Sequence, residues 1–377
     1  MSWSPNEKKI AFSNTSTTGV SLWVVDVATA QAKQLTDYTV NANLGNPFSW
    51  YNDNENILVK MLPKNRPALL DEKKNLTTGP IVSNASGAVS SNRTYQDLLK
   101  NTRDELNFEN IVTAELYKVN LNGSKTLFKA ADMYAGENFS PDGNYLMIST
   151  IQKPFSYIVP LNRFPSKTVV YDKEGKEIKV VNEVALNEIM PKGFMATRTG
   201  KRNMGWRNDQ AATLYYVQAL DEGNPENKVD YRDEVLEWKA PFNEKPSLLI
   251  KTKQRFAGIM WGDETTAIAM DQWYDTRNTK TYLFNPSDLK QEPKIISDRN
   301  SQDIYGDPGN FETVKNTFGK QVLAIENNNL YLLGAGFTKK GQFPFIAEFN
   351  LKTLQTKRIY TSGYTDKKED LLSIEDF

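Results

Sequence analysis

The sequence predicts an all-β fold, a β-propeller of four-stranded blades. An aromatic anchor, a polar turn and an alternating strand recur along the chain, with anchors at Trp3, Trp50, Phe139, Trp206 and Trp261. The anchors are separated by 47, 89, 67 and 55 residues. Spacings near 50, each with about four short strands, are typical of propeller blades. A weaker copy near Gln321 gives about six visible blades. An all-β sandwich or several small β domains is the alternative.

The strands of each unit follow from alternating apolar and polar residues. In the first unit we expect strands at residues 9–13, 21–27 and 33–36, joined by short hairpins, with little of an innermost strand beyond Trp3. The later anchors precede expected strands at residues 57–62, 145–150, 213–217 and 267–270. Each anchor side chain is expected to pack between neighbouring blades. The polar turns are expected at a rim, and in the turn SPDG we expect Gly143 to adopt a positive φ.

The longest spacing predicts an insertion at residues 63–112. Its first part is rich in Pro, Ser, Asn and Gly, and residues 94–106 have apolar side chains near helical spacing, with Thr94 as the expected cap. We therefore expect a loop and a short helix on one face of the propeller. Such insertions often line the binding side of a repeat fold, although a solvated crossover loop fits the sequence equally well.

Composition limits the function classes. The 377 residues include 46 basic and 46 acidic side chains, which argues against a general nucleic-acid or membrane-surface binder. The absence of His and Cys excludes a Ser-His-Asp triad, a thiol nucleophile and a His- or Cys-ligated metal within this chain. No cofactor or metal is expected. Without a signal peptide or a run of about 20 apolar residues, we expect a soluble protein, and a bacterial periplasmic location is one of several that fit.

One basic group does not recur from unit to unit and is the predicted substrate-binding site. Arg198, Lys201, Arg202 and Arg207 fall within ten positions at the entrance to a blade's inner strand. Several guanidinium groups on one face would attract carboxylates, and arginine can hold a carboxylate by two parallel hydrogen bonds. The alternative is a set of exposed turn charges with partners such as Asp209.

Two further arginines, Arg93 and Arg277, are candidates for the same role. The acidic loop at residues 298–307 suggests calcium, but it lacks the glycine and the terminal glutamate of a calcium loop, so a polar rim loop is favoured. Acidic pairs, among them Asp221-Glu222 and Asp233-Glu234, are interpreted as solvated turns, not as the carboxylates of a glycosidase.

Four long segments resemble one family. Residues 93–101 (RTYQDLLKN), 148–167 (ISTIQKPFSYIVPLNRFPSK), 197–223 (TRTGKRNMGWRNDQAATLYYVQALDEG) and 297–309 (SDRNSQDIYGDPG) are similar to the N-terminal propeller region of glutamyl endopeptidases, within the prolyl oligopeptidase family of serine peptidases. The resemblance covers essentially the whole chain. It implies that a Ser-Asp-His triad lies in a C-terminal α/β-hydrolase domain outside this sequence, with the propeller restricting access of peptide substrates.

On this interpretation residues 1–377 form one partial propeller of a longer protein and are inactive alone. The resemblance implies that the parent protein cleaves after Glu. The main alternative is a non-enzymatic propeller that binds proteins or peptides. An exopeptidase parent, with Asp104-Glu105 on a helix holding a substrate amino terminus, is a lesser alternative, because adjacent helical residues point about 100° apart.

Overall fold

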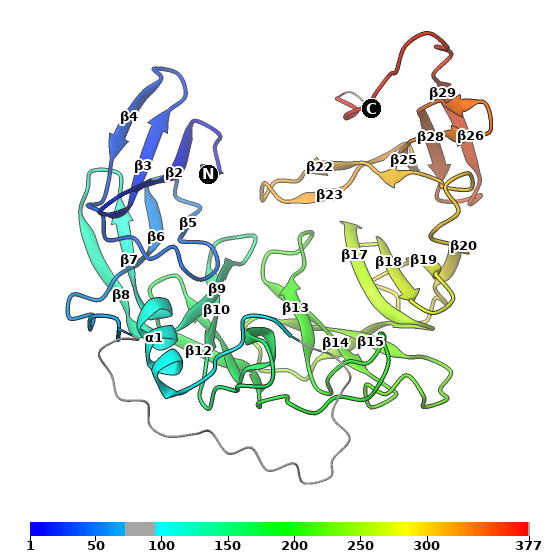
Figure 1. Cartoon of the computed structure of the whole chain (residues 1–377). Helices are drawn as coiled ribbons and strands as arrows, with labels where there is room; N and C mark the ends of the chain where they lie inside the picture. Colours follow the sequence, from blue (N-terminus) through cyan, green and yellow to red (C-terminus); the bar gives the residue numbers. More distant parts are fainter. Residues whose placement is uncertain (72–94, 376–377) are drawn as a thin grey trace. The chain divides into compact units, whose positions relative to one another are not determined.

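A computed structural model describes residues 1–71 and 95–375 of the chain. These residues divide into two compact units, Met1–Met190 and Pro191–Phe377, and each is described here by itself. Within both units nearly all regular structure is β-strand (Figure 1). None of the helices among the described residues is long and apolar enough to cross a membrane.

The first unit contains three four-stranded antiparallel sheets whose strands pair in chain order. The first sheet consists of β1 (Ser2–Trp3), β2 (Lys9–Ser16), β3 (Gly19–Asp26) and β4 (Gln31–Gln34). The second sheet consists of β5 (Phe48–Trp50), β6 (Asn56–Met61), β7 (Ala114–Asn120) and β8 (Lys125–Asp132). The third sheet consists of β9 (Tyr134–Phe139), β10 (Tyr145–Ile151), β11 (Ser166–Asp172) and β12 (Glu177–Val184).

The second unit repeats this arrangement in its first two sheets. The fourth sheet of the chain consists of β13 (Arg202–Trp206), β14 (Thr213–Ala219), β15 (Asp233–Lys239) and β16 (Ser247–Thr252). The fifth sheet consists of β17 (Arg255–Asp263), β18 (Thr266–Trp273), β19 (Asn278–Phe284) and β20 (Lys294–Asn300).

The sixth sheet is less regular. It is formed by β21 (Asn310–Phe311), β25 (Asn329–Gly334), β28 (Phe345–Asn350) and β29 (Thr356–Thr361), and the short β24 (Ile325–Glu326) also pairs with β25. Two small hairpins accompany this sheet: β22 (Thr313–Lys315) with β23 (Gln321–Leu323), and β26 (Phe337–Thr338) with β27 (Gly341–Gln342).

The hydrophobic core is a series of clusters between consecutive sheets of each unit. Trp50 packs with Leu22 of β3 and Val59 of β6, and so joins the first and second sheets. Trp261 packs with Val217 and Val235 of the fourth sheet. Trp50, Phe139 and Trp261 therefore pack between neighbouring sheets, as predicted, but the prediction is wrong for Trp3, whose side chain is 52% exposed. Sheets with apolar residues on both faces must stack on one another, because each apolar face has to be covered by another element.

The polar turn after an anchor is held by its own side chains. In the turn after Phe139, Ser140 Oγ donates to Asp142 Oδ1 (2.5 Å) and accepts from the Tyr145 amide (3.0 Å). Gly143 has a φ of +73°, and a Cβ there would lie 2.7 Å from the Asn52 Nδ2 atom. Glycine is therefore required at position 143 both for the backbone conformation and for space, in agreement with the prediction.

The all-β, propeller-type fold is confirmed among the described residues, with five four-stranded sheets and one five-stranded sheet, and with two local corrections. The first sheet does have a first strand, since Ser2 and Trp3 pair with Ala11 and Ile10. The sixth sheet begins at Asn310, and the residues near Gln321 belong to a separate hairpin. Short strands of two or three residues carry too little alternation to be recognised in the sequence.

The insertion contains a helix, but not where the sequence indicated. Helix α1 spans Thr102–Val112, and Asn101, not Thr94, is its N-cap, with its side chain accepting from the Asp104 amide at 3.0 Å. Thr94 lies outside the described residues. An asparagine at the cap satisfies a helix donor, and acidic residues in the first turn favour the helix dipole. These local signals therefore outweigh the apolar spacing further upstream.

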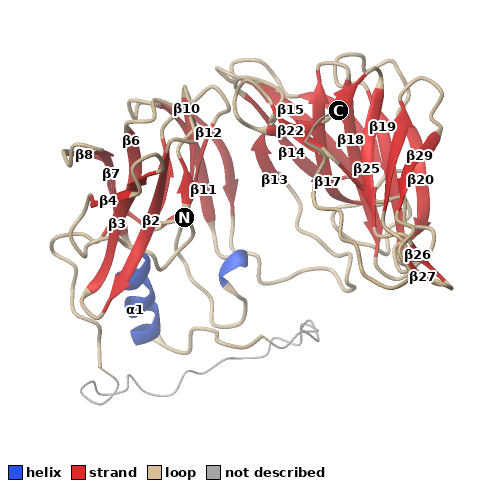
Figure 2. Cartoon of the chain, turned by 90° about the horizontal axis from the view of Figure 1, so that it is seen from above, coloured by secondary structure: helices blue, strands red, loops and turns tan. Residues whose placement is uncertain are grey.

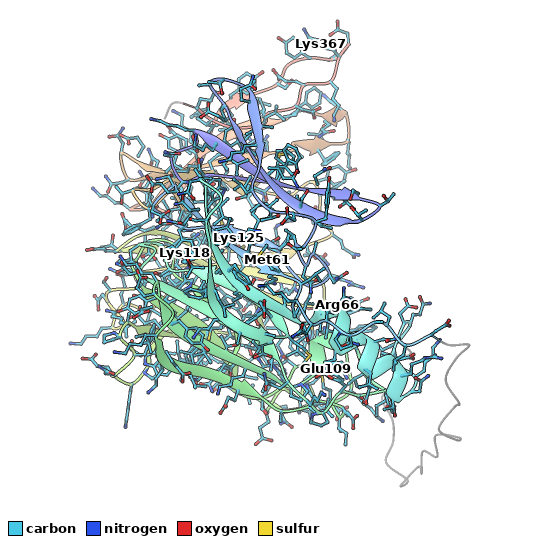
Figure 3. The ribbon with its side chains drawn as sticks, turned by 90° about the vertical axis from the view of Figure 1, so that its left-hand side faces the viewer. Met61, Arg66, Glu109, Lys118, Lys125 and Lys367 are labelled. Carbon is cyan, nitrogen blue, oxygen red and sulfur yellow. The ribbon has the colours of Figure 1, made fainter. Side chains whose placement is uncertain are left out.

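Helix α1 is fixed by aromatic packing to the connection between β10 and β11 of the third sheet. The Phe108 ring lies 5.1 Å from Phe155 and 6.0 Å from Phe164, both edge-on. Phe164 follows the short 3₁₀ helix η1 (Leu161–Arg163), and Figure 2 shows both helices at the same end of the strands of the first unit. Near the start of the insertion, Arg66 donates from Nε to the Asn110 carbonyl. Figure 3 shows Arg66 beside Glu109.

Candidate functional site: an arginine cluster in the second unit

Residues 194–202 form a strap across one end of the fourth and fifth sheets. Arg255, the first residue of β17, donates from Nε to the Met195 carbonyl at 2.7 Å. Thr197 donates its amide to the Gly223 carbonyl at 3.0 Å, in the loop after β14. Gly223 has a φ of +74°, and a Cβ there would lie 2.0 Å from the Thr197 carbonyl oxygen. These contacts hold the backbone of the strap in place up to the start of β13.

Beneath the strap, two buried aspartates hold three arginines. Asp221 is 1% exposed and accepts from Arg255 Nη1 (2.8 Å) and Nη2 (2.7 Å) and from Arg232 Nη1 (2.8 Å). Asp233 is fully buried, accepts from Arg255 Nη1 at 3.1 Å and forms an ion pair with Arg202 Nη2. Such charge-assisted, two-pronged contacts fix the guanidinium planes.

The charges of these groups affect one another's titration. Burial alone would raise the pKa of Asp221, but the hydrogen bonds from Arg255 and Arg232 outweigh burial, so this pKa lies below its usual value. Burial, and then the nearby charge of Arg202, lower the pKa of Arg198. Arg198 donates to the carbonyl oxygens of Thr199 (3.1 Å) and Lys201. The Arg198 guanidinium therefore lies against the carbonyl of the residue that precedes Arg202.

Cations stacked on aromatic rings surround the network. Arg232 lies 4.6 Å from the centre of the Trp273 ring, and Lys201 lies 4.5 Å from that of Trp238. Arg277 lies 3.7 Å from the centre of the Tyr274 ring. Tyr274 in turn packs against Phe194 of the strap, with ring centroids 4.4 Å apart. Cation–π contacts of this kind hold positive charge without neutralising it.

Arg207 lies at the opposite end of β13, because this strand runs from Arg202, opposite Val217, to Trp206, opposite Leu214. Arg207 is 3% exposed. Its Nε and Nη2 donate to the two oxygens of Asp209 (3.1 and 2.6 Å), and its Nη1 donates to Glu237 Oε2 (2.6 Å). The guanidinium also lies 4.4 Å from the centre of the Trp261 ring. Two carboxylates thus surround one buried arginine.

The structure therefore divides the predicted site. Arg198, Lys201, Arg202 and Arg277 come from segments at one end of the fourth and fifth sheets, whereas Arg207 belongs to a separate buried ion-pair group. Arg93 lies outside the described residues. A direct role of these residues in substrate binding stays a prediction.

Sequence reasoning missed the residues that organise this site: Asp221, Arg232, Asp233 and Arg255. The interpretation of Asp221 and Asp233 as solvated turn residues is wrong, because both side chains are buried against arginines. A signal was present in the sequence. Strand β14 ends at Ala219 and the antiparallel strand β15 begins at Asp233, so both acids lie at the same end of the fourth sheet. The first residue of β17, Arg255, lies next to them.

The acidic loop at residues 298–307 is occupied by its own protein partners. Asp298 accepts from Asn278 Nδ2 (2.7 Å) and pairs with Lys280, while Asp303 accepts from the Tyr305 and Gly306 amides (both 3.1 Å). Asp307 pairs with Arg299 at 3.1 Å. No group of three or more metal-ligating side chains occurs within residues 1–71 and 95–375. These contacts are those of a polar rim loop.

Sequence comparison finds two curated plant proteins similar to this chain over its whole length. Both are named "Probable glutamyl endopeptidase, chloroplastic": the protein from Oryza sativa subsp. japonica is 35% identical over 391 residues, covering 99% of this chain, and that from Arabidopsis thaliana is 32% identical over 404 residues, covering 100% of it. The resemblance to glutamyl endopeptidases is confirmed. The chain spans 41% and 42% of the lengths of these relatives. No family model matches the chain.

Solved structures with a related arrangement are more distant. A prolyl endopeptidase aligns with a TM-score of 0.48 and 12% identity, covering 96% of this chain and 41% of that one. Prolyl oligopeptidase B from Galerina marginata aligns with a TM-score of 0.49 and 12% identity, covering 97% and 42%. An oligogalacturonate lyase aligns with a TM-score of 0.47 and 12% identity, covering 98% and 78%. Similarity at this level does not indicate an activity.

Proposed function

We propose that this chain is the propeller portion of a serine endopeptidase of the prolyl oligopeptidase family, which selects peptide substrates and controls their access to a catalytic domain. The similarity of the whole chain to proteins named glutamyl endopeptidase supports this role. Cleavage after Glu is the specificity we propose. Because the chain contains no His, a Ser-Asp-His triad must be supplied by an α/β-hydrolase domain outside this sequence.

The observation that carries the proposal is the excess of positive charge under and beside the strap. Arg202, Arg232 and Arg255 pair with two buried carboxylates, and among the described residues the neighbouring Arg198 bonds to backbone carbonyls. The positive charge would attract an acidic side chain of a substrate. Arg277, Lys201 and, from outside the described residues, Arg93 are further proposed contributors to acidic-substrate selection, whereas Arg207, which is buried between Asp209 and Glu237, is assigned a structural role.

The test is to express the full open reading frame that encodes this chain and to assay it on two peptides that differ only by Glu or Gln. The 377-residue chain alone serves as the blank. We expect hydrolysis after Glu by the longer product, at least about tenfold slower hydrolysis of the Gln peptide, and no hydrolysis by the blank. Equal hydrolysis of both peptides would contradict the specificity, and an inactive longer product would contradict the enzymatic role.

A second candidate function is a non-enzymatic propeller that binds proteins or peptides. Exposed aromatic residues favour it: Phe194 is 67% exposed and Tyr274 is 39% exposed, and the two rings pack against each other. Aromatic and arginine side chains are enriched at binding interfaces. Retention of a specific partner by a longer product that hydrolyses neither peptide would support this alternative.

A further inference from the structure

The arginine cluster, defined as Arg198, Arg202, Arg232 and Arg255, carries more charge than its surroundings neutralise. Asp221 receives hydrogen bonds from Arg255 and Arg232, and Asp233 contacts Arg255 and Arg202. Three guanidinium groups therefore share two carboxylates, and the hydrogen bonds of the fourth, that of Arg198, go to backbone carbonyls. Charged groups removed from water are normally paired, because unpaired burial is costly.

Carboxylates in the adjoining loop do not restore this balance. Glu222, Glu226 and Asp230 are all exposed to solvent. Water and salt screen exposed charges over short distances, whereas the contacts of Asp221 and Asp233 are made inside the protein. The imbalance is therefore local to the strap.

Arg198 and Arg202 are the members of the cluster with unused capacity. The hydrogen bonds of Arg198 within the described residues go to the carbonyls of Thr199 and Lys201, which carry no net charge. The side chain of Arg202 is 10% exposed, and its Nε is buried without a hydrogen-bond acceptor among the described residues. A buried donor without an acceptor is costly, and a ligand oxygen that reaches it removes that cost.

We propose that Arg198 and Arg202 together bind the carboxylate of an acidic side chain in a peptide, and that Asp221, Asp233 and Arg255 are positioning residues for this pair. The inference deepens the proposed function and rests on it for the peptide as the source of the carboxylate. A planar carboxylate matches the fork of a guanidinium and would offset the mutual repulsion of the two arginines.

The neighbouring aromatic surface provides a place for the residue next to the acid. The Phe194 and Tyr274 rings pack against each other at the start of the strap, and Arg277 lies on the Tyr274 ring. Met195 joins this aromatic pair to the cluster, because its carbonyl accepts from Arg255. An apolar side chain beside the acidic residue would cover the exposed part of Phe194, which favours a peptide with adjacent apolar and acidic residues.

The test measures binding of acetyl-Ala-Leu-Glu-Ala-amide and its Gln counterpart to the 377-residue chain by calorimetry. We expect the Glu peptide to bind at least about tenfold more tightly than the Gln peptide. Arg198→Gln is expected to remove this preference, and Arg202→Lys to reduce it, because lysine keeps the charge but not the fork. The matched control is Arg358→Gln on β29, an exposed arginine of the same unit stacked on Phe345, which is expected to leave the preference unchanged.

Three outcomes would overturn the inference: an equal preference in the wild type and Arg198→Gln, an equal loss in Arg358→Gln, or equally tight binding of inorganic phosphate and the Glu peptide. The same variants in the longer product separate this failure from failure of the proposed function. If Arg198→Gln retains Glu-selective hydrolysis, the proposed function stands and this carboxylate site does not. If the wild-type longer product hydrolyses neither peptide, the peptidase role itself fails.

Discussion

The two ends of strand β13 use arginine in opposite ways. At the C-terminal end, Arg207 lies between Asp209 and Glu237, and the exposed Lys239 also pairs with Glu237, so positive and negative charges balance. At the N-terminal end, Arg202 belongs to a cluster of four arginines with two buried aspartates. The two arginines are five positions apart in the sequence, and both belong to one basic stretch.

The comparison shows that local charge balance, not proximity in sequence, separates the roles of these residues. Arg207 stacks on the anchor Trp261 and donates to carboxylates from three of its nitrogens, so it joins the fourth and fifth sheets. At the strap, positive charge remains after the internal partners are counted. The first arrangement stabilises the protein, and we propose that the second binds a ligand.

The largest effect is expected from Arg207→Met. This change leaves Asp209 buried without its cation and Glu237 with only the exposed Lys239, which should lower the free energy of unfolding by about 3–5 kcal/mol. Urea unfolding followed by tryptophan fluorescence measures it. Arg358→Met, which removes an exposed arginine, is the control. A loss below about 1 kcal/mol, or a selective loss of the Glu-peptide preference in folded protein, would remove the distinction between the two ends.

A smaller effect is expected from Asp221→Asn, and it should depend on pH. The pKa of Asp221 is lower in the folded state than in the unfolded chain, so its stabilisation is present above its unfolded pKa of about 3.9 and is lost as pH falls through the folded value. The variant should lose about 1–3 kcal/mol at neutral pH and show a weaker fall in stability on acidification. Unfolding free energies measured from pH 7 to pH 3 test this, and parallel curves would contradict it.

Lys201→Met should cost less, about 0.5–1 kcal/mol, because it removes the cation–π contacts with Trp238 and Tyr216 while an aliphatic side chain is retained. The unfolding midpoint in urea measures the effect. Lys201→Arg keeps the cation and is expected to restore stability. A loss as large as that of Arg207→Met would mean that the strap also depends on a closed ion-pair group.

The smallest effect on stability is expected from Arg198→Gln. This arginine bonds to carbonyl oxygens and is repelled by Arg202, so its replacement should change the free energy of unfolding by less than about 0.5 kcal/mol in either direction. The comparison with Arg207→Met is then sharp, because the two substitutions remove the same charge from the same basic stretch. Destabilisation of Arg198→Gln by 2 kcal/mol or more would assign Arg198 a structural role.

Much of the fold could be predicted from the sequence because it depends on local pattern. Trp50, Trp206 and Trp261 mark the ends of first strands, and the turn at Gly143 has the conformation that its residues favour. The start of α1 could not be predicted by apolar spacing, since Asn101 and the packing of Phe108 on Phe155 and Phe164 decide it. The site was predicted only in outline, as a basic stretch.

The sequence by itself determined the repeated unit, the aromatic anchors between sheets and the absence of a histidine-based triad, because these follow from residue type and period. Only the tertiary structure decided which charges meet. Three residues from different strands or loops of two sheets, Asp221, Asp233 and Arg255, come together because antiparallel strands return the chain to the same end of a sheet. Electrostatic pairing depends on distance and burial, and neither is contained in the order of residues along a chain.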